Sequence, residues 1–483
     1  MKKQFFVVLV ISLIIPSTLA SAQSAVPDPS GGSPRADAAA AQQCQAWLHV
    51  FNAGDRAKLL EFVTKYRPDT VAHVDDELGF RARVGGFDLK KVEESTPTHF
   101  AAVMQERASE QFARMDCEID AKPPHIITKL DLHPMPRPEE FAIPRLLQPE
   151  AIAAFRSYLD KSAASGTFSG AALLAQNGKP LLAQAYGMAD REKKIPNRLS
   201  TQFRIGSMNK MFTAVSILQL AQAGKLQLTD PLAKFLPDYA NKDLASKVTL
   251  HHLLTHTGGT GDIFGPKFDE HRLDLRTLED YVNLYQSRPL KFEPGAQWDY
   301  SNYGFLLLGV VIEKVSGQSY YDYVREHVFQ PAGMNSTDSL PENEVVPLRS
   351  VGYMQPDPNS PLTPNTGTLP FRGTSAGGGY STVEDLLRFA NALTSHKLLD
   401  AEHTTLLTTG KADTPNGTKY AYGFMDSTQA GLHCFGHGGG APGMNGDLRI
   451  CTASGFVIAV LSNLDPPAAQ RPADFIAVRL PLQ

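Results

Sequence analysis

Cysteine is scarce in this sequence: four are present among 483 residues, and no two of them form a Cys-x-x-Cys pair. No close set of cysteines and histidines takes the place of such a pair, so the sequence indicates no structural metal site. An excess of one charge is missing as well, because the formal net charge is only −4. A chain this close to neutral has no strongly basic character that would favour nucleic acid or an anionic membrane as a partner.

A long apolar run is also missing at the start of the chain. Residues 5–15 are almost all apolar, but they are fewer than the ~20 that a membrane-spanning helix needs. Lys2 and Lys3 precede this run and Ala20-Ser21-Ala22 follows it, as in a cleavable secretory signal. No cysteine follows the run to carry a lipid. We therefore expect a signal peptide over 1–22, no membrane anchor after its cleavage, and a periplasmic or secreted protein.

Export changes what the four cysteines predict, because an oxidising compartment allows disulfides. Cys44 and Cys117 form an early pair in the sequence, and Cys434 and Cys451 form a late one. Each pair is a candidate disulfide, and the alternative is that the cysteines are small buried apolar residues. For the late pair we predict a bridge, because it flanks an expected loop over 437–446 between two strands.

The length of the chain predicts two folded units rather than one. Residues 23–42 are rich in Ala, Ser, Pro and Gly and indicate a flexible leader, while the proline-rich stretch 134–147 indicates a linker. Between them, 43–133 combines a helical pattern with strand-like pieces, which predicts a small α+β unit. Its residues 47–55 (WLHVFNAGD) resemble the first helix of nuclear-transport-factor-like domains.

The second unit, 148–483, has strand patterns at both of its ends. After a helix at 149–165, two β-like runs at 170–175 and 180–186 are joined through Asn177-Gly178, a strong hairpin signal. A long region with helical periodicity follows. Further strands are expected at 421–425, 432–435, 447–452 and 456–462, and a last helix at 468–479. Strands at both ends around inserted helices predict an α/β fold with one sheet interrupted by a helical region.

Ser207 and Lys210 form the single Ser-x-x-Lys pair of the sequence. Two residues three apart at the start of a helix lie on one face, one turn apart. A neutral lysine amine there can take the serine proton, and the helix N-terminus favours negative charge developing on the serine oxygen. The pair therefore predicts a nucleophile, Ser207, with Lys210 as its base.

Four segments around this pair carry a family resemblance. They are 203–217 (FRIGSMNKMFTAVSI), 249–259 (TLHHLLTHTGG), 292–309 (FEPGAQWDYSNYGFLLLG) and 377–393 (GGGYSTVEDLLRFANAL). In this order they resemble the β-lactamase-related serine hydrolases, which include class C β-lactamases, D-Ala-D-Ala carboxypeptidases, D-aminopeptidases and family VIII esterases. The resemblance implies an antiparallel sheet flanked by helices, with an inserted helical region, and a reaction that needs no metal and no organic cofactor.

Tyr300-Ser301-Asn302 resembles the Tyr-x-Asn element of this family. The resemblance implies that Tyr300 transfers protons beside Lys210 and that Asn302 contacts the substrate near its carbonyl. For the phenol to act in this way, we expect the Lys210 ammonium to lower its pKa. Without the resemblance, Tyr300 would be interpreted as a core tyrosine in an aromatic segment.

His437-Gly438-Gly439-Gly440 resembles the Lys-Thr-Gly element on the strand that borders the active site of the family. Glycines there allow a substrate to lie against the strand, and the amides of Ser207 and Gly440 are the expected oxyanion hole. Gly439 is assigned to the same substrate-binding edge. His437 stands where penicillin-recognising members have lysine, and histidine is mostly neutral near pH 7. Recognition of a substrate carboxylate is therefore weakened.

Two other patterns compete with this interpretation. Gly373-Thr374-Ser375-Ala376-Gly377 fits the Gly-x-Ser-x-Gly elbow of α/β-hydrolases, but a proline- and threonine-rich loop precedes it where that motif needs an apolar strand. His251, His252 and His256 could hold a metal, but no carboxylate follows at a suitable spacing, so we interpret them as structural.

The sequence therefore predicts an exported serine hydrolase that forms an acyl-serine intermediate, with a carboxylesterase acting on small esters as the first hypothesis. A D-amino-acid peptidase or carboxypeptidase, or a β-lactamase, is the alternative within the enzymes. A catalytically silent scaffold or binding protein is the alternative outside them. The expected partner is a small ester or peptide substrate, and the oligomeric state stays open.

Overall fold

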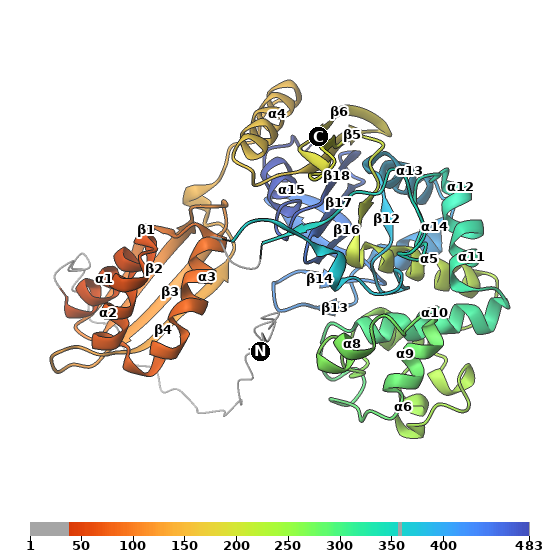
Figure 1. The fold of residues 1–483 in the computed structure, drawn as a ribbon, viewed down its shortest axis with the longest axis horizontal. Helices are drawn as coiled ribbons and strands as arrows, with labels where there is room; N and C mark the ends of the chain where they lie inside the picture. The colour runs from red at the N-terminus through yellow and green to blue at the C-terminus, as the bar shows by residue number, and fades with distance from the viewer. Residues whose placement is uncertain (1–37, 356–359, 483) are drawn as a thin grey trace.

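The structure is a computed structural model that describes residues 38–355 and 360–482. Figure 1 shows two folded units, a smaller one close to the start of the described chain and a larger one that contains the rest. The expected signal peptide, 1–22, lies outside the described residues, as does the expected leader up to residue 37.

The N-terminal unit is a four-stranded antiparallel sheet with helices packed against it. Its helices are α1 (Ala39–Ala53), α2 (Arg56–Tyr66), η1 (Pro68–His73) and α3 (Val74–Val84). Its strands are β1 (Phe87–Ser95), β2 (His99–Glu106), β3 (Phe112–Ile119) and β4 (Ile127–Met135), and they follow one another in the sheet in this order. Trp47 and Phe51 of α1 are buried in the core that this helix shares with β2 and β3. The apolar positions that predicted a helix therefore build the core.

The ends of this unit differ slightly from the expected boundaries. α1 begins at Ala39, inside the stretch 23–42 that its composition predicted to be a leader, because its first alanines favour helix and are buried in the core. β4 continues to Met135, past residue 133, since an edge strand tolerates the proline at position 134. The expected linker 134–147 also contains a short helical turn, η2 (Glu139–Phe141).

The larger unit is built on an eight-stranded antiparallel sheet. Its strands lie in the order β13-β14-β15-β16-β17-β18-β5-β6. Their bounds are β5 (Gly170–Gln176), β6 (Lys179–Tyr186), β13 (Ala412–Asp413), β14 (Lys419–Tyr420), β15 (Met425–Gln429), β16 (Leu432–Ala441), β17 (Met444–Cys451) and β18 (Phe456–Ser462). Three short strand pairs join loops around it: β7 (Met188–Asp190) with β8 (Ile195–Pro196), β9 (Phe203–Arg204) with β12 (Tyr380–Ser381), and β10 (Tyr353–Met354) with β11 (Thr363–Pro364). Strands from both ends of the unit share one sheet, which confirms the predicted fold class.

Both faces of the central strands are covered. β18 and β5 are apolar along almost their whole length because neither face meets water. Their side chains alternate between two cores, with Ile458 on the side of α4 (Gln148–Ala164) and α15 (Gln470–Ala477) and Ala459 on the other side. α13 (Val383–Thr394) packs on β18 and β5 from that second side. The sheet is thus the middle layer of three (Figure 1).

The helical region lies between β9 and β13 in the sequence. Its α-helices, apart from α13, are α5 (Asn209–Gln222), α6 (Lys242–Lys247), α7 (Leu250–Leu254), α8 (Pro266–His271), α9 (Leu278–Tyr285), α10 (Asn302–Ser316), α11 (Tyr320–Val324), α12 (Gln330–Ala332) and α14 (Ala401–Thr408). Short helical turns are η3 (Gly206–Met208), η4 (Leu232–Lys234), η5 (Arg325–Phe329) and η6 (Asn365–Thr368). α5 and α10 are buried on nearly all sides and pack against each other. These two helices carry the residues that the sequence singled out.

Two expectations for the strands were wrong. The expected strand 421–425 is mostly a turn, in which Gly423 adopts a left-handed conformation (φ 72°) and the amide of Ala421 donates to the carbonyl of Phe424. The expected loop 437–446 is strand on both sides of a turn at 442–443, because 437–441 pair in register with 448–444. The glycine-rich segment therefore belongs to β16 itself.

Both pairs of cysteines are disulfide-bonded. Cys44–Cys117 joins α1 to β3, with the Cα atoms 6.3 Å apart. Cys434–Cys451 joins β16 to β17, with the Cα atoms 4.1 Å apart, within the ~7 Å that an unstrained bridge can reach. The predicted late bridge is confirmed, and the early pair, which the sequence left open, is bridged as well.

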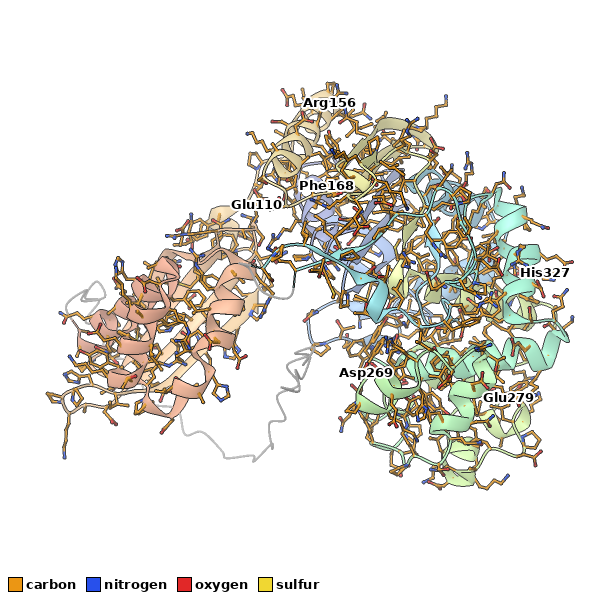
Figure 2. The ribbon with its side chains drawn as sticks, in the orientation of Figure 1. Glu110, Arg156, Phe168, Asp269, Glu279 and His327 are labelled. Atoms are coloured by element: carbon orange, nitrogen blue, oxygen red, sulfur yellow. A yellow bond between two sulfur atoms is a disulfide. The ribbon has the colours of Figure 1, made fainter. Side chains whose placement is uncertain are left out.

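The two units contact each other at α15 and at the residues directly after it. Glu110, labelled in Figure 2, forms an ion pair of 2.6 Å with Arg479. Next to it, Gln111 donates to the carboxylate of Asp474 at 3.3 Å. Both of these contacts are polar, as is common between units of one chain.

No helix within residues 38–355 and 360–482 is both long enough and apolar enough to cross a membrane.

Candidate active site

Ser207 lies in the helical turn η3, directly before α5. The turn brings its backbone against β16, so close that a side chain on Gly206 would meet the amide nitrogen of Gly440 at 2.8 Å. Gly206 also has a positive φ of 52°, which only glycine adopts without strain. The side chain of Ser207 is partly exposed. The fold thus presents this hydroxyl at an accessible point between the sheet and the helical region.

Lys210 is fully buried one helical turn behind Ser207. Its Nζ lies 3.2 Å from Oγ of Ser207, 2.7 Å from Oδ1 of Asn302 and 2.6 Å from the carbonyl oxygen of Ala376. Burial lowers the pKa of Lys210 to about 7, and the negative charge of Asp262 opposes this shift. An amine with this pKa is neutral in about half of the molecules at pH 7, as a general base requires.

Tyr300 stands over the amine of Lys210. The Nζ atom lies 4.7 Å from the centre of the Tyr300 ring. Burial raises the pKa of Tyr300 well above 10, although a hydrogen bond with Ser207 lowers it in part. The expectation that the Lys210 ammonium lowers this pKa was wrong, because burial raises the pKa and the group that lowers it in part is Ser207. Tyr300 is therefore a phenol that can pass a proton but does not start as a base.

The loop 256–262 holds the Tyr300 segment in place. The carbonyl of His256 accepts from the amide of Asp299 at 2.9 Å, and its Nδ1 accepts from the amide of Ser301 at 3.1 Å. These two bonds fix the backbone on both sides of Tyr300, whose ring lies 4.2 Å from the imidazole between ring centres. His256, interpreted as structural from the sequence, thus supports the proposed proton-transfer residue.

Asn302 is the first residue of α10, and its side chain bridges Lys210 and Asp262. Its Oδ1 faces the lysine, while its Nδ2 donates to Asp262 at 3.1 Å. Sequence reasoning missed both Asp262 and the carbonyl of Ala376. A backbone carbonyl leaves no signal in the residue type, and Asp262 lies outside the segments that carry the family resemblance.

His437 is buried within β16, the strand that borders the site. Its Nδ1 faces the carbonyl of Gly438, so Nδ1 carries the proton and Nε2 accepts from the hydroxyl of Tyr420 at 3.0 Å. Burial, with a smaller contribution from Lys210, lowers the pKa of His437 to about 3. The imidazole is thus neutral near pH 7 and already engaged.

Gly439 and Gly440 run beside the backbone of Ser207. A side chain on Gly439 would meet the carbonyl oxygen of Ile205 at 1.9 Å and the amide nitrogen of Ser207 at 3.1 Å. Only glycine allows this approach of two backbones. Gly440 is exposed, so a substrate can reach this edge, and it pairs with Asn445 in β17.

The competing serine is inaccessible. The side chain of Ser375 is fully buried, and a side chain on Gly309 would meet its Oγ at 2.4 Å. An elbow nucleophile needs an exposed hydroxyl. The residue after Ser375 in this segment, Ala376, belongs to the site described above, because its carbonyl accepts a hydrogen bond from Lys210.

The three histidines of the second segment have other partners. Nδ1 of His251 lies 2.8 Å from the hydroxyl of Tyr422. Nδ1 of His252 accepts from the amide of Thr249 at 3.2 Å and caps α7, and His256 accepts from Ser301. Within 38–355 and 360–482, no group of three or more His, Cys, Asp or Glu side chains is arranged to hold a metal ion.

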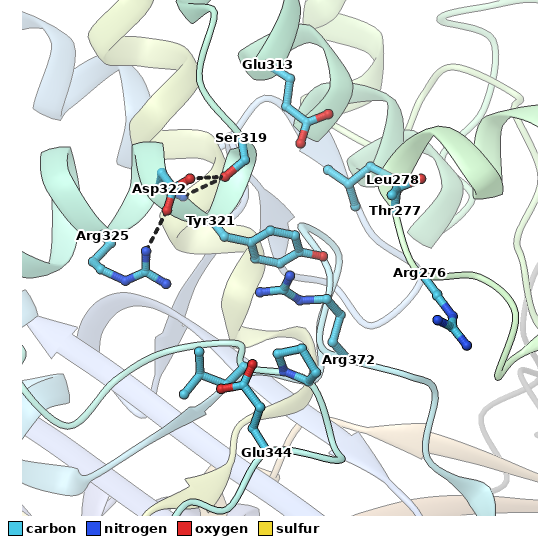
Figure 3. Close-up of a pocket in the computed structure, with 12 residues that line it drawn as sticks. Arg276, Thr277, Leu278, Glu313, Ser319, Tyr321, Asp322, Arg325, Glu344 and Arg372 are labelled. Carbon is cyan, nitrogen blue, oxygen red and sulfur yellow. Dashed lines mark hydrogen bonds and ion pairs between the residues drawn. The ribbon is translucent and has the colours of Figure 1, made fainter.

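A hollow of about 380 Å³ lies apart from these residues, between α10, α11 and the loop that contains Arg372 (Figure 3). Its lining includes Arg276, Arg372, Glu313 and Glu344, and Tyr321 lies under the guanidinium of Arg372. None of the predicted catalytic residues is among those that line it. The hollow is therefore not the place of the predicted chemistry.

Comparison with known proteins places residues 154–483 in the family described as Beta-lactamase. The chain is 32% identical to the putative penicillin-binding protein PbpX of Bacillus subtilis (strain 168) over 298 residues, which cover 61% of this chain and 70% of that protein. It is 32% identical to the esterase EstB of Burkholderia gladioli over 256 residues, 46% of this chain and 64% of that protein.

Two solved structures share the fold of the larger unit. A penicillin-binding protein from Bacillus halodurans matches with a TM-score of 0.59 and 34% identity, over 66% of this chain and 97% of that one. A D-stereospecific amidohydrolase from Streptomyces sp. matches with a TM-score of 0.57 and 29% identity, over 67% of this chain and 97% of that one. These matches do not test the resemblance of 47–55 to nuclear-transport-factor-like domains, which stays a prediction.

Proposed function

Because this chain belongs to the Beta-lactamase family of serine hydrolases, we propose that it hydrolyses small carboxylic esters through an acyl-serine intermediate on Ser207. The observation that carries this proposal is the buried amine of Lys210, 3.2 Å from Oγ of Ser207. Its pKa of about 7 supplies a base that is neutral in about half of the molecules at pH 7.

Acylation begins with proton transfer from Ser207 to Lys210. The serine oxygen attacks the ester carbonyl carbon, and the negative charge on the carbonyl oxygen is stabilised by the amides of Ser207 and Gly440. The bond to the leaving alcohol then breaks, and the alcohol takes a proton from the phenol of Tyr300. Lys210 returns its proton to Tyr300, so the site is neutral again and Ser207 carries the acyl group.

Deacylation follows the same path with water as the nucleophile. Lys210, with Tyr300 as relay, takes a proton from the water as its oxygen attacks the acyl carbon. The bond to Ser207 breaks, the serine oxygen is reprotonated, and the carboxylic acid leaves. The contact of Asn302 with the substrate near its carbonyl, which the family resemblance implies, is part of this proposal.

An ester fits this site better than a substrate with a carboxylate beside the scissile bond. At the position of the family lysine, His437 is buried, neutral and bonded to Tyr420. A charge-assisted hydrogen bond to a substrate carboxylate is therefore missing at this edge. The 32% identity with the esterase EstB supports the same substrate class.

Amide hydrolysis at a D-amino acid is a second candidate. The observation that favours it is the similarity to the D-stereospecific amidohydrolase from Streptomyces sp.. An amide needs the same nucleophile and base, together with protonation of a poorer leaving group, which Tyr300 is placed to provide.

We also propose that the protein is exported and that its signal peptide, 1–22, is cleaved. Two disulfides support this, because such bonds persist in oxidising compartments. Under this proposal the mature protein acts in the periplasm or outside the cell.

Labelling of one enzyme preparation with a fluorescent fluorophosphonate and a fluorescent penicillin, side by side, tests the proposed function. We expect the fluorophosphonate to label the wild type rapidly and the penicillin to label it slowly or not at all. The Ser207→Ala variant, with its fold retained, accepts neither. A wild type that reacts with neither probe contradicts the proposed function.

A further inference from the structure

Asp262 lies behind Asn302 and is bonded to it twice. Its Oδ1 accepts from the backbone amide of Asn302 at 3.0 Å, and its Oδ2 accepts from the side-chain Nδ2 of Asn302 at 3.1 Å. The Oδ1 atom also accepts from the amide of Ile263 at 2.8 Å. The carboxylate is partly buried, and among the described residues it forms no ion pair with a lysine or arginine. The carboxylate of Asp262 thus accepts hydrogen bonds from the first residue of α10 and from its own loop.

The two bonds decide which end of the Asn302 amide faces Lys210. A carboxylate only accepts hydrogen bonds, whereas an amide has one accepting end and one donating end. The Nδ2 end must therefore face Asp262, and the Oδ1 end is left to face Lys210 at 2.7 Å. A flipped amide would set two acceptors against each other at Asp262 and a donor against the amine.

The amide orientation in turn decides where the lone pair of the neutral lysine points. A neutral amine has two N–H bonds and one lone pair. The oxygen of Asn302 and the carbonyl of Ala376, at 2.7 and 2.6 Å, accept the two N–H bonds. The lone pair is left for the third neighbour, Oγ of Ser207 at 3.2 Å. An amine held in this way is aimed at the proton that it must take.

We propose that Asp262 is a positioning residue that fixes the Asn302 amide and, through it, aims the lone pair of Lys210 at Ser207. This inference rests on the proposed function, because it assigns Lys210 the role of base. Asp262 touches neither the reacting oxygen nor the amine.

The negative charge of Asp262 also affects the pKa of Lys210, so its removal should change the pH dependence of the reaction as well as its rate. The groups that interact with Lys210 from the surrounding elements are Asp262, His256, His437 and Tyr300. Both imidazoles have a pKa lowered by burial and the pKa of the phenol is raised, so these three are neutral near pH 7. Asp262 is the acidic member of this set, and it raises the pKa of Lys210.

The test compares Asp262→Asn and Asp262→Ala with the wild type on p-nitrophenyl butyrate from pH 5 to pH 10. In the Asn variant two amide donors face each other, so Asn302 turns over and presents its nitrogen to Lys210. We expect the plateau of kcat/KM to fall between ten- and hundredfold, the size of a lost charge-assisted bond. We also expect the acid limb to move to lower pH by about one unit, because a negative charge near the amine is gone.

The direction in which the acid limb of the pH profile moves distinguishes a positioning role of Asp262 from a general loosening of the site. A variant whose site opens to water would desolvate Lys210 less, and its limb would move to higher pH. Asp230→Asn is the matched control, because Asp230 also accepts from a backbone amide and is partly buried, but its side chain contacts Gln227 and Lys234. It should match the wild type in both readouts.

An unchanged plateau and limb in both Asp262 variants, or a limb that moves to higher pH, overturns the inference. The rate of fluorophosphonate labelling against pH supplies the same readouts if esters are turned over poorly. A wild type that is silent in both assays contradicts the proposed function itself. An active wild type with unaffected Asp262 variants contradicts only the role of Asp262.

Discussion

The hydroxyl of Tyr420 donates to Nε2 of His437 across 3.0 Å, inside the active-site wall. Both side chains are buried. The bond uses the imidazole nitrogen that would otherwise be available to a substrate, and burial keeps the ring neutral because it lowers the pKa of His437 to about 3. The glycine-rich edge of β16 therefore offers a substrate its backbone, without a cation at this position.

This arrangement predicts a preference for activated esters over penicillins. A penicillin carries a carboxylate that a strand-edge lysine would hold, and losing such a charged hydrogen bond costs ~1.5–3 kcal/mol, one to two decades in rate. The measurement is kcat/KM for p-nitrophenyl butyrate and for nitrocefin on the same preparation. A higher value for nitrocefin would reject the esterase assignment while leaving the Ser207 mechanism in place.

Lys210 predicts the pH dependence of the reaction. As base it must be unprotonated, so kcat/KM should rise with pH and reach half of its plateau near pH 7, where burial sets the pKa of the amine. Loss of activity at high pH should not come from Tyr300 below pH 10, because burial raises the pKa of that phenol. A stopped-flow pH profile with p-nitrophenyl butyrate provides the measurement.

Lys210→Arg should be nearly inactive, with kcat lowered at least a thousandfold. A guanidinium keeps its proton under all assay conditions and cannot act as a base. Circular dichroism and thermal unfolding serve as the control for folding. If this variant retained most of the wild-type rate, Lys210 could not be the base.

The disulfide Cys434–Cys451 predicts a loss of stability when it is removed. It joins two cysteines 17 positions apart in the sequence, and closing a loop of about this length stabilises the fold by ~3 kcal/mol in the chain-entropy model. The double variant Cys434→Ser/Cys451→Ser should lower the free energy of unfolding of the larger unit by about that amount, measured in urea. The matched variant Cys44→Ser/Cys117→Ser should affect the N-terminal unit and leave esterase activity unchanged. An equal urea midpoint for the wild type and the first variant would contradict this contribution of the bridge to stability.

Much of the fold could be predicted from the sequence because its local patterns agree with the tertiary structure. The run 456–462 is apolar at almost every position and forms a strand as expected. Asn177-Gly178 favours a tight turn by its residue types alone, and the two strands beside it pair as expected. The expected strand 421–425 failed because Gly423 packs against the backbone of Lys210. That contact arises only once the distant helix α5 is in place.

The site could be predicted in part for the same reason. Ser207 and Lys210 are one helical turn apart, so a local rule brings them together. Ala376 reaches Lys210 from a separate loop with its carbonyl, which every residue possesses. Asp262 lies on another loop and is linked by hydrogen bonds to Lys210 through Asn302. The bond between His437 and Tyr420 joins two different strands, so the residue type alone could not predict it.

The central claim is that Ser207 is the nucleophile, and the Ser207→Ala and Ser375→Ala variants test it most directly. Both are assayed for turnover of p-nitrophenyl butyrate, and the fluorophosphonate adduct on the wild type is located by mass spectrometry of its peptides. We expect the adduct on Ser207, a loss of turnover in Ser207→Ala, and near wild-type turnover in Ser375→Ala, whose hydroxyl is buried. Full turnover in Ser207→Ala, with an inactive but folded Ser375→Ala, would contradict the account.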